Sequence, residues 1–285
     1  MKQGRTAPLF GPGGNSEAFH ATKMKTEQAP LWLAEIGLDA YEYEAGRGVT
    51  STDAALVRLG DYAKQKGIYV SVHAPYFISL SGVVPETRYK SIGYIAESLH
   101  AAKLLGADTI VVHTGSAAKI SREEALRLAA DTLYHTLDEL APQDVVIGLE
   151  TMGKQNQLGT LEEVISLCKM DPRLQPVVDF GHMNARELGG VFKSADDYRR
   201  VFDAIADALG DDSAKNLHCH FSKIEWTSAG EKRHLTFEDR VFGPDFEPLM
   251  EAIYREKLTP TLISESAGTQ SEDALAMKKH YLSLS

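Results

Sequence analysis

Short apolar runs alternate along this chain with longer segments in which apolar residues recur every three or four positions. The short runs are typical of buried strands, and the periodic segments are typical of helices that bury one face. Strands that alternate with helices at intervals of about 30 to 44 residues predict parallel strands joined by right-handed crossovers. The predicted strands lie at about residues 6–11, 39–45, 68–73, 108–113, 145–151, 176–181, 216–221 and 260–265.

Residues that favour helix ends stand at the borders of the periodic segments. Thr160 with Glu163, and Ser121 with Glu124, have the spacing of a capping box at a helix start. Three glycines stand just after a periodic segment and just before a strand, where a C-cap is expected. They are Gly37, Gly67 and Gly106.

Eight strand–helix units in 285 residues predict a (β/α)8 TIM barrel, an α/β fold, as a single domain over residues 1–285. A doubly wound open sheet is the alternative. The run Gly11-Pro12-Gly13-Gly14 follows the first predicted strand, but it lacks the G-x-G-x-x-G spacing of a dinucleotide-binding turn. Residues 222–245 form the longest irregular stretch, and a long loop of this kind is often functional.

Composition indicates a soluble protein. The hydrophobic content of 43% is ample for a packed core, and no apolar run approaches a membrane span. Cys168 and Cys219 form no disulfide framework, and residues 1–10 have no signal-peptide core. We therefore expect a cytoplasmic monomer that is not attached to a membrane. The net charge of −10 argues against a nonspecific nucleic-acid binder, although metal ions and a small basic patch can suffice for phosphate contact.

Most of the predicted strands end at a side chain that can hold a metal ion. Taken singly, each such residue is more often a buried, hydrogen-bonded group. In a barrel, however, all the strand ends meet at one mouth, where six strands would have to end independently in a ligand-type group and where burying unpaired carboxylates would be costly. The six are His73, His113, Glu150, Asp179, His220 and Glu265, and His182 follows one turn after Asp179.

This ligand set predicts a metal centre. Imidazole and carboxylate groups suit zinc, and the carboxylates also admit manganese or iron. A carboxylate such as Glu150 can bridge two ions, and two-metal sites polarise a phosphoryl oxygen and activate water as a nucleophile. The second strand runs into two further acids, Glu42 and Glu44.

The seventh strand offers two histidines on one face. Strand alternation puts His218 and His220 on the same side and turns Cys219 toward the helices. Catalytic groups usually occupy the outermost position of a barrel strand, so we expect His220 to be the ligand. His218 is expected deeper, supporting the ligands rather than joining them.

From about His73 to Glu265, the order of these strand-end residues along the chain resembles the order in the endonuclease IV family of zinc-dependent apurinic/apyrimidinic endonucleases. The similar segments are His73-Ala-Pro-Tyr76, Val112-His113-Thr-Gly115, Leu149-Glu150-Thr151 followed by Gln157-Leu158-Gly159-Thr160, Asp179-Phe-Gly-His182, His220 and Ile263-Ser-Glu265-Ser. The resemblance implies hydrolysis of the phosphodiester at abasic sites in DNA, as in DNA repair.

The resemblance also implies roles for individual residues. His73, His113 and Glu150 would hold one zinc ion. Glu150, Asp179, His220 and Glu265 would hold a second, and His182 and His234 would belong to a third. Glu150 and Glu265 would also be catalytic, by orienting the attacking water. Tyr76 would lie close to the substrate nucleotide, and Lys232 and Arg233 would stabilise phosphate charge.

Two departures from the family pattern lower these expectations for the third ion and for DNA. The family has an aspartate two residues before the loop histidine, where this chain has Lys232, and Glu231 is one residue out of register. We therefore expect a third ion that is weakly held or absent. After the second strand, the family's arginine-bearing DNA-probing segment is replaced by acids around Arg47.

Two other functions remain open. The sugar isomerases and epimerases of the xylose-isomerase-like superfamily share this barrel, bind one divalent metal and move a proton beside a carbonyl. Glu150 and Glu265 would suit that chemistry, but the large histidine set favours the hydrolase. A regulatory barrel that binds a metal or a sugar phosphate without catalysis is the third possibility.

Overall fold

The computed structural model describes residues 5–140 and 144–285, and within them eight parallel strands form one sheet. The sheet order is β1-β10-β7-β6-β5-β4-β3-β2. Strands β2 to β7 therefore lie side by side in chain order, and β10 lies between β7 and β1. The strands are β1 (Leu9–Pro12), β2 (Ala40–Glu44), β3 (Tyr69–His73), β4 (Thr109–His113), β5 (Val146–Glu150), β6 (Leu174–Asp179), β7 (His218–Phe221) and β10 (Thr261–Ser264).

The sheet closes into a barrel between β1 and β2, which stand at the two ends of this order. The amide of Asp39 donates to the Phe10 carbonyl and that of Gly14 to the Glu42 carbonyl, both at 2.9 Å. This seam requires Gly11, because a Cβ there would lie 2.0 Å from the Ala40 carbonyl oxygen. The TIM barrel predicted from the sequence is therefore confirmed.

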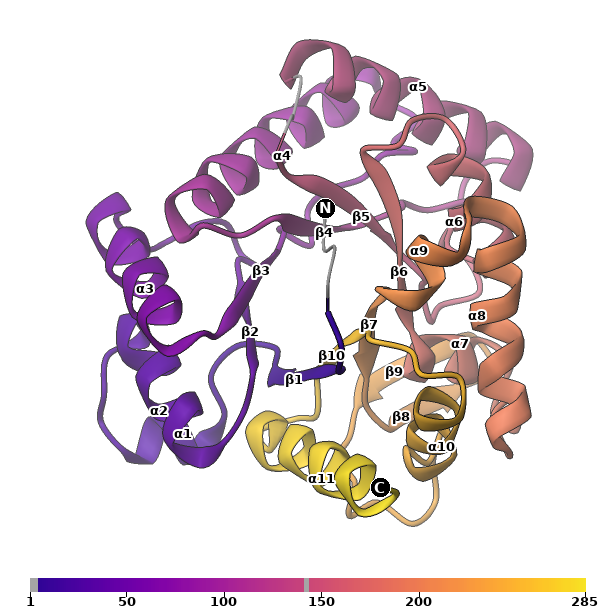
Figure 1. The fold of residues 1–285 in the computed structure, drawn as a ribbon. Helices are drawn as coiled ribbons and strands as arrows, with labels where there is room; N and C mark the ends of the chain where they lie inside the picture. The colour runs from indigo at the N-terminus through magenta and orange to yellow at the C-terminus, as the bar shows by residue number, and fades with distance from the viewer. Residues whose placement is uncertain (1–4, 141–143) are drawn as a thin grey trace.

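Helices surround the barrel between successive strands (Figure 1). Their starts and ends follow the signals in the sequence: Thr160 and Glu163 form a capping box, and Gly37, Gly67 and Gly106 end their helices with positive φ. The helices are α1 (Glu17–Ala21), η1 (Thr26–Gln28), α2 (Ala29–Ile36), α3 (Asp53–Lys66), α4 (Pro85–Leu105), α5 (Arg122–Leu140), α6 (Leu161–Cys168), α7 (Phe180–Arg186), α8 (Ala195–Leu209), α9 (Asp211–Lys215), α10 (Glu247–Arg255) and α11 (Gln270–Ser283).

An antiparallel hairpin interrupts the pattern after β7. Its strands are β8 (Ile224–Thr227) and β9 (Gly230–His234), and they form a separate two-stranded sheet. The hairpin occupies part of the stretch 222–245 that was expected to be irregular, so that expectation was wrong for residues 224–234. A hydrogen bond connects the hairpin to the loop after β5, since the Glu231 amide donates to the Gly153 carbonyl at 3.0 Å.

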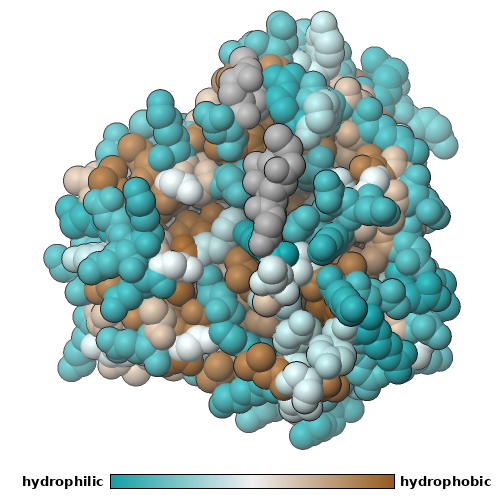
Figure 2. Space-filling model, viewed as in Figure 1, coloured by the Kyte–Doolittle hydropathy of each residue, from teal (hydrophilic) through white to brown (hydrophobic). Residues whose placement is uncertain are grey.

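The apolar core lies between the strands and the helices, while the interior of the barrel is partly polar. Large buried side chains such as Phe180 and Tyr198 pack outside the sheet, whereas Glu42, Ser71 and His218 are buried within it. On the face drawn in Figure 2, hydrophilic side chains cover the outer helices and apolar ones show between them. No helix in the described ranges is long and apolar enough to cross a membrane.

The two ends of the barrel differ in character. A cavity of about 1010 Å³ lies at the amino-terminal ends of the strands, lined by residues such as Thr109, Val146 and Leu217. The ligand-type residues lie at the opposite, carboxyl-terminal ends of the strands, where barrel enzymes carry out their chemistry. The clustered histidines and carboxylates therefore place the candidate site at this second end, and not at the cavity.

Candidate metal centre

Glu150, the last residue of β5, is the centre of the cluster. Its Oε2 lies 3.1 Å from His113 Nε2 and 3.5 Å from His73 Nε2. Its Oε1 lies 3.1 Å from His220 Nδ1 and 3.3 Å from His182 Nδ1. The two oxygens of one buried carboxylate thus face two different pairs of histidines, which is the arrangement a bridging ligand needs.

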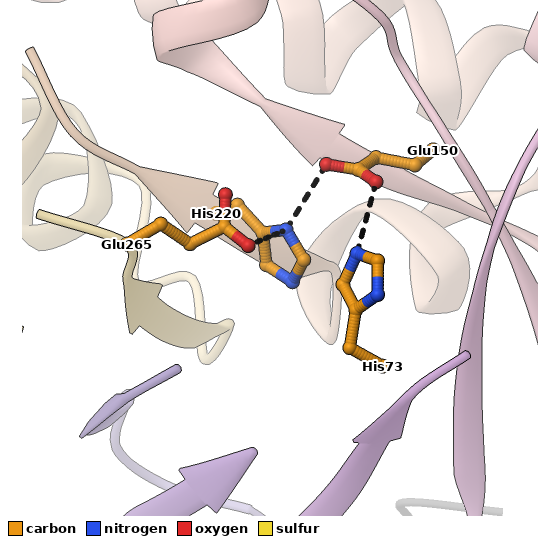
Figure 3. A group of neighbouring side chains, drawn as sticks. All are labelled: His73, Glu150, His220 and Glu265. Atoms are coloured by element: carbon orange, nitrogen blue, oxygen red, sulfur yellow. Dashed lines mark hydrogen bonds and ion pairs between the residues drawn. The ribbon is translucent and has the colours of Figure 1, made fainter. Parts of the chain in front are cut away.

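Glu265, directly after β10, completes the cluster on the far side of His220. Its Oε1 lies 3.3 Å from His220 Nδ1, and its Oε2 lies 3.9 Å from His234 Nδ1. Figure 3 shows His73, Glu150, His220 and Glu265 pointing toward one another from different strands. These four residues each offer a ligand atom within 4.8 Å of the others.

Asp179 and His182 are positioned by the junction of β6 and α7. Asp179 Oδ1 accepts from the His182 amide at 2.7 Å and so caps the helix, while Oδ2 lies 3.3 Å from His182 Nδ1. Because the helix starts at once, the strand ends at Asp179 rather than running to residue 181 as expected. The capping role and the ligand role are compatible, since each uses a different oxygen.

The electrostatics of the cluster call for added positive charge. Burial raises the pKa of Glu150, but contacts with His113, His182 and His220 outweigh it and hold that pKa well below its usual value. Burial lowers the pKa of His73, but the carboxylates of Glu44 and Glu150 outweigh it and raise it to about 10. Buried carboxylates and imidazoles this close together require protons or cations between them.

The donor set fits a divalent metal ion. Glu150 Oε2 and Asp179 Oδ2 are buried and have no hydrogen-bond partner among the described residues. Histidine nitrogens and carboxylate oxygens converge on them, and this mixture of donors suits zinc and similar ions. A second group with the same chemistry, within the described residues, consists of Glu150, Asp179 and His182.

A further group at the hairpin consists of His182, Glu231 and His234. Glu231 Oε2 lies 3.5 Å from His182 Nε2. Glu231 is one residue out of register in the sequence, yet it reaches His182 because β9 contains a bulge: Glu225 pairs with Arg233 and Trp226 with Glu231. Lys232 is the extra residue of the bulge, and skipping it turns Glu231 to the side of His234.

Lys232 and Arg233 lie on the exposed side of the hairpin. Lys232 Nζ and Arg233 Nε each lie 2.6 Å from a carboxylate oxygen of Glu225. A weakly held or absent third ion was expected because Lys232 takes the place of an aspartate, but the Lys232 side chain is paired with Glu225. Both cations are on the surface, and Glu225 neutralises one of the two charges.

Tyr76 lies at the rim of the mouth. Its side chain is 55% exposed, and its ring centroid is 5.2 Å from that of His73 and 5.4 Å from that of His113. Its hydroxyl donates to Glu44 Oε2 at 3.3 Å. The ring is therefore placed to touch a molecule that enters the mouth.

The sequence analysis noted Glu42 and Glu44 only as acids of the second strand, and the structure brings both to the cluster. Glu42 Oε1 lies 2.8 Å from His220 Nε2, and Glu42, Glu44 and Glu265 offer oxygens within 4.8 Å of one another. The available signal was strand alternation, which puts residues 42 and 44 on the same face of β2.

Comparisons with known proteins agree with this architecture. Residues 30–280 match the family model described as a xylose isomerase-like TIM barrel. An uncharacterized protein of Methanocaldococcus jannaschii is 28% identical over 86% of this chain and 88% of its own length. A probable endonuclease 4 of Acholeplasma laidlawii is 31% identical over 68% of this chain and 66% of its own length.

Two solved structures show the same fold. Endonuclease IV from Thermus thermophilus aligns with a TM-score of 0.72 at 19% identity, over 98% of this chain and all of that one. A D-tagatose 3-epimerase-like protein aligns with a TM-score of 0.69 at 19% identity, over 97% of each chain. With its eight-stranded barrel and a family match over most of its length, the chain belongs to the xylose isomerase-like TIM barrel family.

Proposed function

We propose that this protein is a metal-dependent phosphodiesterase that hydrolyses DNA at abasic sites, as endonuclease IV does. The observation that carries the proposal is the position of Glu150, whose two buried oxygens face two separate pairs of histidines. A centre for two ions favours phosphoryl transfer over single-metal proton transfer. The probable endonuclease 4 relatives support the same activity.

The residues divide into overlapping sets around Glu150. His73 and His113 would hold a first zinc ion with one oxygen of Glu150. Asp179, His220 and Glu265 would hold a second with the other oxygen. Such ions supply charge for the scissile phosphate and lower the pKa of water. Manganese or iron is compatible with the carboxylates in the set.

A third ion fits at the hairpin, between His182, Glu231 and His234. Glu231 supplies the carboxylate that Lys232 cannot. This site shares His182 with the group around Asp179, so its occupancy would depend on how His182 is used.

The chain's own residues would position the substrate and the water. Glu150 and Glu265 would act in catalysis by accepting a hydrogen bond from the attacking water and fixing its direction. Tyr76 would stack or pack against the nucleotide at the rim, and Lys232 and Arg233 would contact backbone phosphates from the hairpin. Attack at phosphorus by water would form a new P–O bond and break the bond to the leaving oxygen, which takes up the proton that water loses, so the products are a phosphomonoester and an alcohol.

Metal analysis combined with a nicking assay tests the proposal. The purified protein should contain at least two divalent ions per chain and should nick a duplex with one abasic site but not the intact duplex. Removal of the ions by a chelator should abolish nicking, and zinc should restore it. Less than one ion per chain, in protein never exposed to chelator, would contradict the proposal.

A sugar epimerase or isomerase is the second candidate. Glu44, next to Tyr76, makes the mouth more acidic, which favours a neutral polyol over a polyanion, and the fold matches a D-tagatose 3-epimerase-like protein. Glu150 and Glu265 could then move a proton beside a carbonyl. Ketohexoses incubated with the manganese-loaded protein and analysed by chromatography would reveal this activity; no abasic-site nicking together with new ketoses would decide for it.

A further inference from the structure

A buried polar network lies directly beneath the proposed metal centre, inside the barrel. Its members are Glu42 on β2, Ser71 on β3 and His218 on β7, all nearly inaccessible to solvent. We propose that Glu42 is a positioning residue that holds His220 with Nδ1 toward the mouth and thereby sets the affinity of the second ion. This inference rests on the metal centre of the proposed function.

The two nitrogens of His220 face opposite ways. Nε2 lies 2.8 Å from Glu42 Oε1, below the centre. Nδ1 lies 3.1 Å from Glu150 Oε1 and 3.3 Å from Glu265 Oε1, within it. His220 therefore connects the network to the ligands.

The contact with Glu42 selects which nitrogen of His220 carries the proton. An ionised carboxylate only accepts hydrogen bonds, so a bare Nε2 at 2.8 Å would set its lone pair against an anion. Neither Glu42 Oε1 nor His220 Nε2 makes a regular hydrogen bond among the described residues, so their 2.8 Å ion pair is the contact that compensates the burial of both atoms. With the proton on Nε2, neutral His220 presents the lone pair of Nδ1 to the mouth.

Glu42 is itself held in place from two sides. Ser71 Oγ donates to Oε2 at 2.7 Å, and His218 Nε2 lies 2.9 Å from the same oxygen. The strand register explains both contacts: Ser71 is the β3 partner of Glu42, and His218 lies two residues before His220 on the same face of β7. Two contacts thus fix Oε2 and leave Oε1 for His220.

A carboxylate behind a ligating histidine fixes the ring and raises its basicity, and loss of such a partner typically weakens metal binding by about 10- to 100-fold. Here the effect is expected at one ion. His73 and His113 have their own surroundings, for example His73 Nδ1 at 2.8 Å from the Ala74 carbonyl. Substitution of Glu42 should therefore weaken the second ion and spare the first.

Two Glu42 variants test this. Glu42→Leu removes the acceptor, and Glu42→Gln keeps an oxygen that can still accept from Nε2. The matched control is Glu163→Gln, which removes a hydrogen-bonded carboxylate outside the barrel. Zinc per chain is measured by elemental analysis after chelator competition, and cobalt spectra report the ligands of each ion. Thermal unfolding of each variant shows that it has folded.

We expect Glu42→Leu to weaken one of two ions by about 10- to 100-fold, with Glu42→Gln intermediate and the control unchanged. Folded Glu42 variants with the zinc affinities of the wild type would overturn the inference, and so would equal weakening of both ions in Glu42→Gln. So would the loss of an extra ion held by Glu42, His218 and His220 while the second ion stayed in place. A wild-type protein without zinc would instead overturn the metal centre itself.

Discussion

At the residue scale, the charge of Glu150 and the positions of its two oxygens are what the centre depends on. A neutral amide cannot serve two cations, so Glu150→Gln should lose zinc from both of the first two positions. Nicking of abasic DNA should fall at least about 100-fold, as expected when metal ligation is lost. Glu163→Gln should retain both properties. An active, zinc-loaded Glu150→Gln protein would show that Glu150 is not the bridge.

The histidines give the metal-free protein a distinctive dependence on pH. Burial alone would lower the pKa of His73, yet Glu44 and Glu150 raise it to about 10, above the value of about 6.5 for an unfolded chain. A group whose pKa is raised by folding stabilises the fold below its unfolded pKa, and that contribution disappears as the pH rises through the folded pKa. The free energy of unfolding of chelator-treated protein should therefore fall between about pH 7 and pH 10.

Urea titrations at several pH values measure this trend. Zinc should reverse it, because binding displaces protons from the histidines and becomes tighter as the pH rises. A flat profile for the metal-free protein would mean that the carboxylates around His73 are not ionised.

At the scale of elements, the hairpin decides whether a third ion is held. The bulge at Lys232 turns Glu231 toward His182 and leaves the lysine paired with Glu225 on the surface. Glu231→Gln should therefore lower the zinc affinity of this position at least about 10-fold, because loss of even a supporting contact typically weakens metal binding by about 10- to 100-fold. Lys232→Ala is the matched control and should keep the ion. The opposite ranking in elemental analysis would contradict this account of the bulge.

The short apolar runs explain how much of the site could be predicted. They placed His73, His113, Glu150 and His220 at or near strand ends, and the structure brings those side chains together. They could not place Glu231, because a bulge changes the register by one residue and depends on the partner strand. The hairpin itself was missed, since its polar strands, with residues such as Glu225 and Arg233, carry no apolar run.

The contribution of Glu42 was hidden for a different reason. A glutamate on an interior strand position is unusual, but its partners Ser71 and His218 come from distant parts of the sequence. Only closure of the barrel brings β2 and β7 close enough for the contact. The sequence therefore predicted the fold and the histidines and carboxylates that gather at the strand ends, but not the groups that contact them from inside the barrel.

At the scale of the whole molecule, the negative charge limits how DNA could bind. With a net charge of −10 and only two cations on the hairpin, most of the attraction for phosphate must come from bound ions. Affinity for an abasic duplex should therefore vanish on chelation. With metal present, the plot of log affinity against log salt should have a shallow slope, with a magnitude below about 3.

Fluorescence anisotropy with a labelled duplex measures both effects. Arg233→Ala should lower the slope further, whereas Arg127→Ala, on the outer helix α5, should leave it unchanged. A steep salt dependence that persists without metal would point to a basic surface elsewhere on the molecule.

The order of the ligands along the chain has a consequence for biosynthesis. The residues proposed for the first ion, His73, His113 and Glu150, lie in the first two-thirds of the sequence, whereas Glu265 follows the last strand. During translation the first three could meet before the chain is finished, but the second set cannot be complete until β10 has left the ribosome and entered the sheet between β1 and β7. An ion bound by Glu150, Asp179, His220 and Glu265 would then join the last strand of the barrel to its middle strands, so capture of this metal would mark the closure of the barrel in the newly made protein.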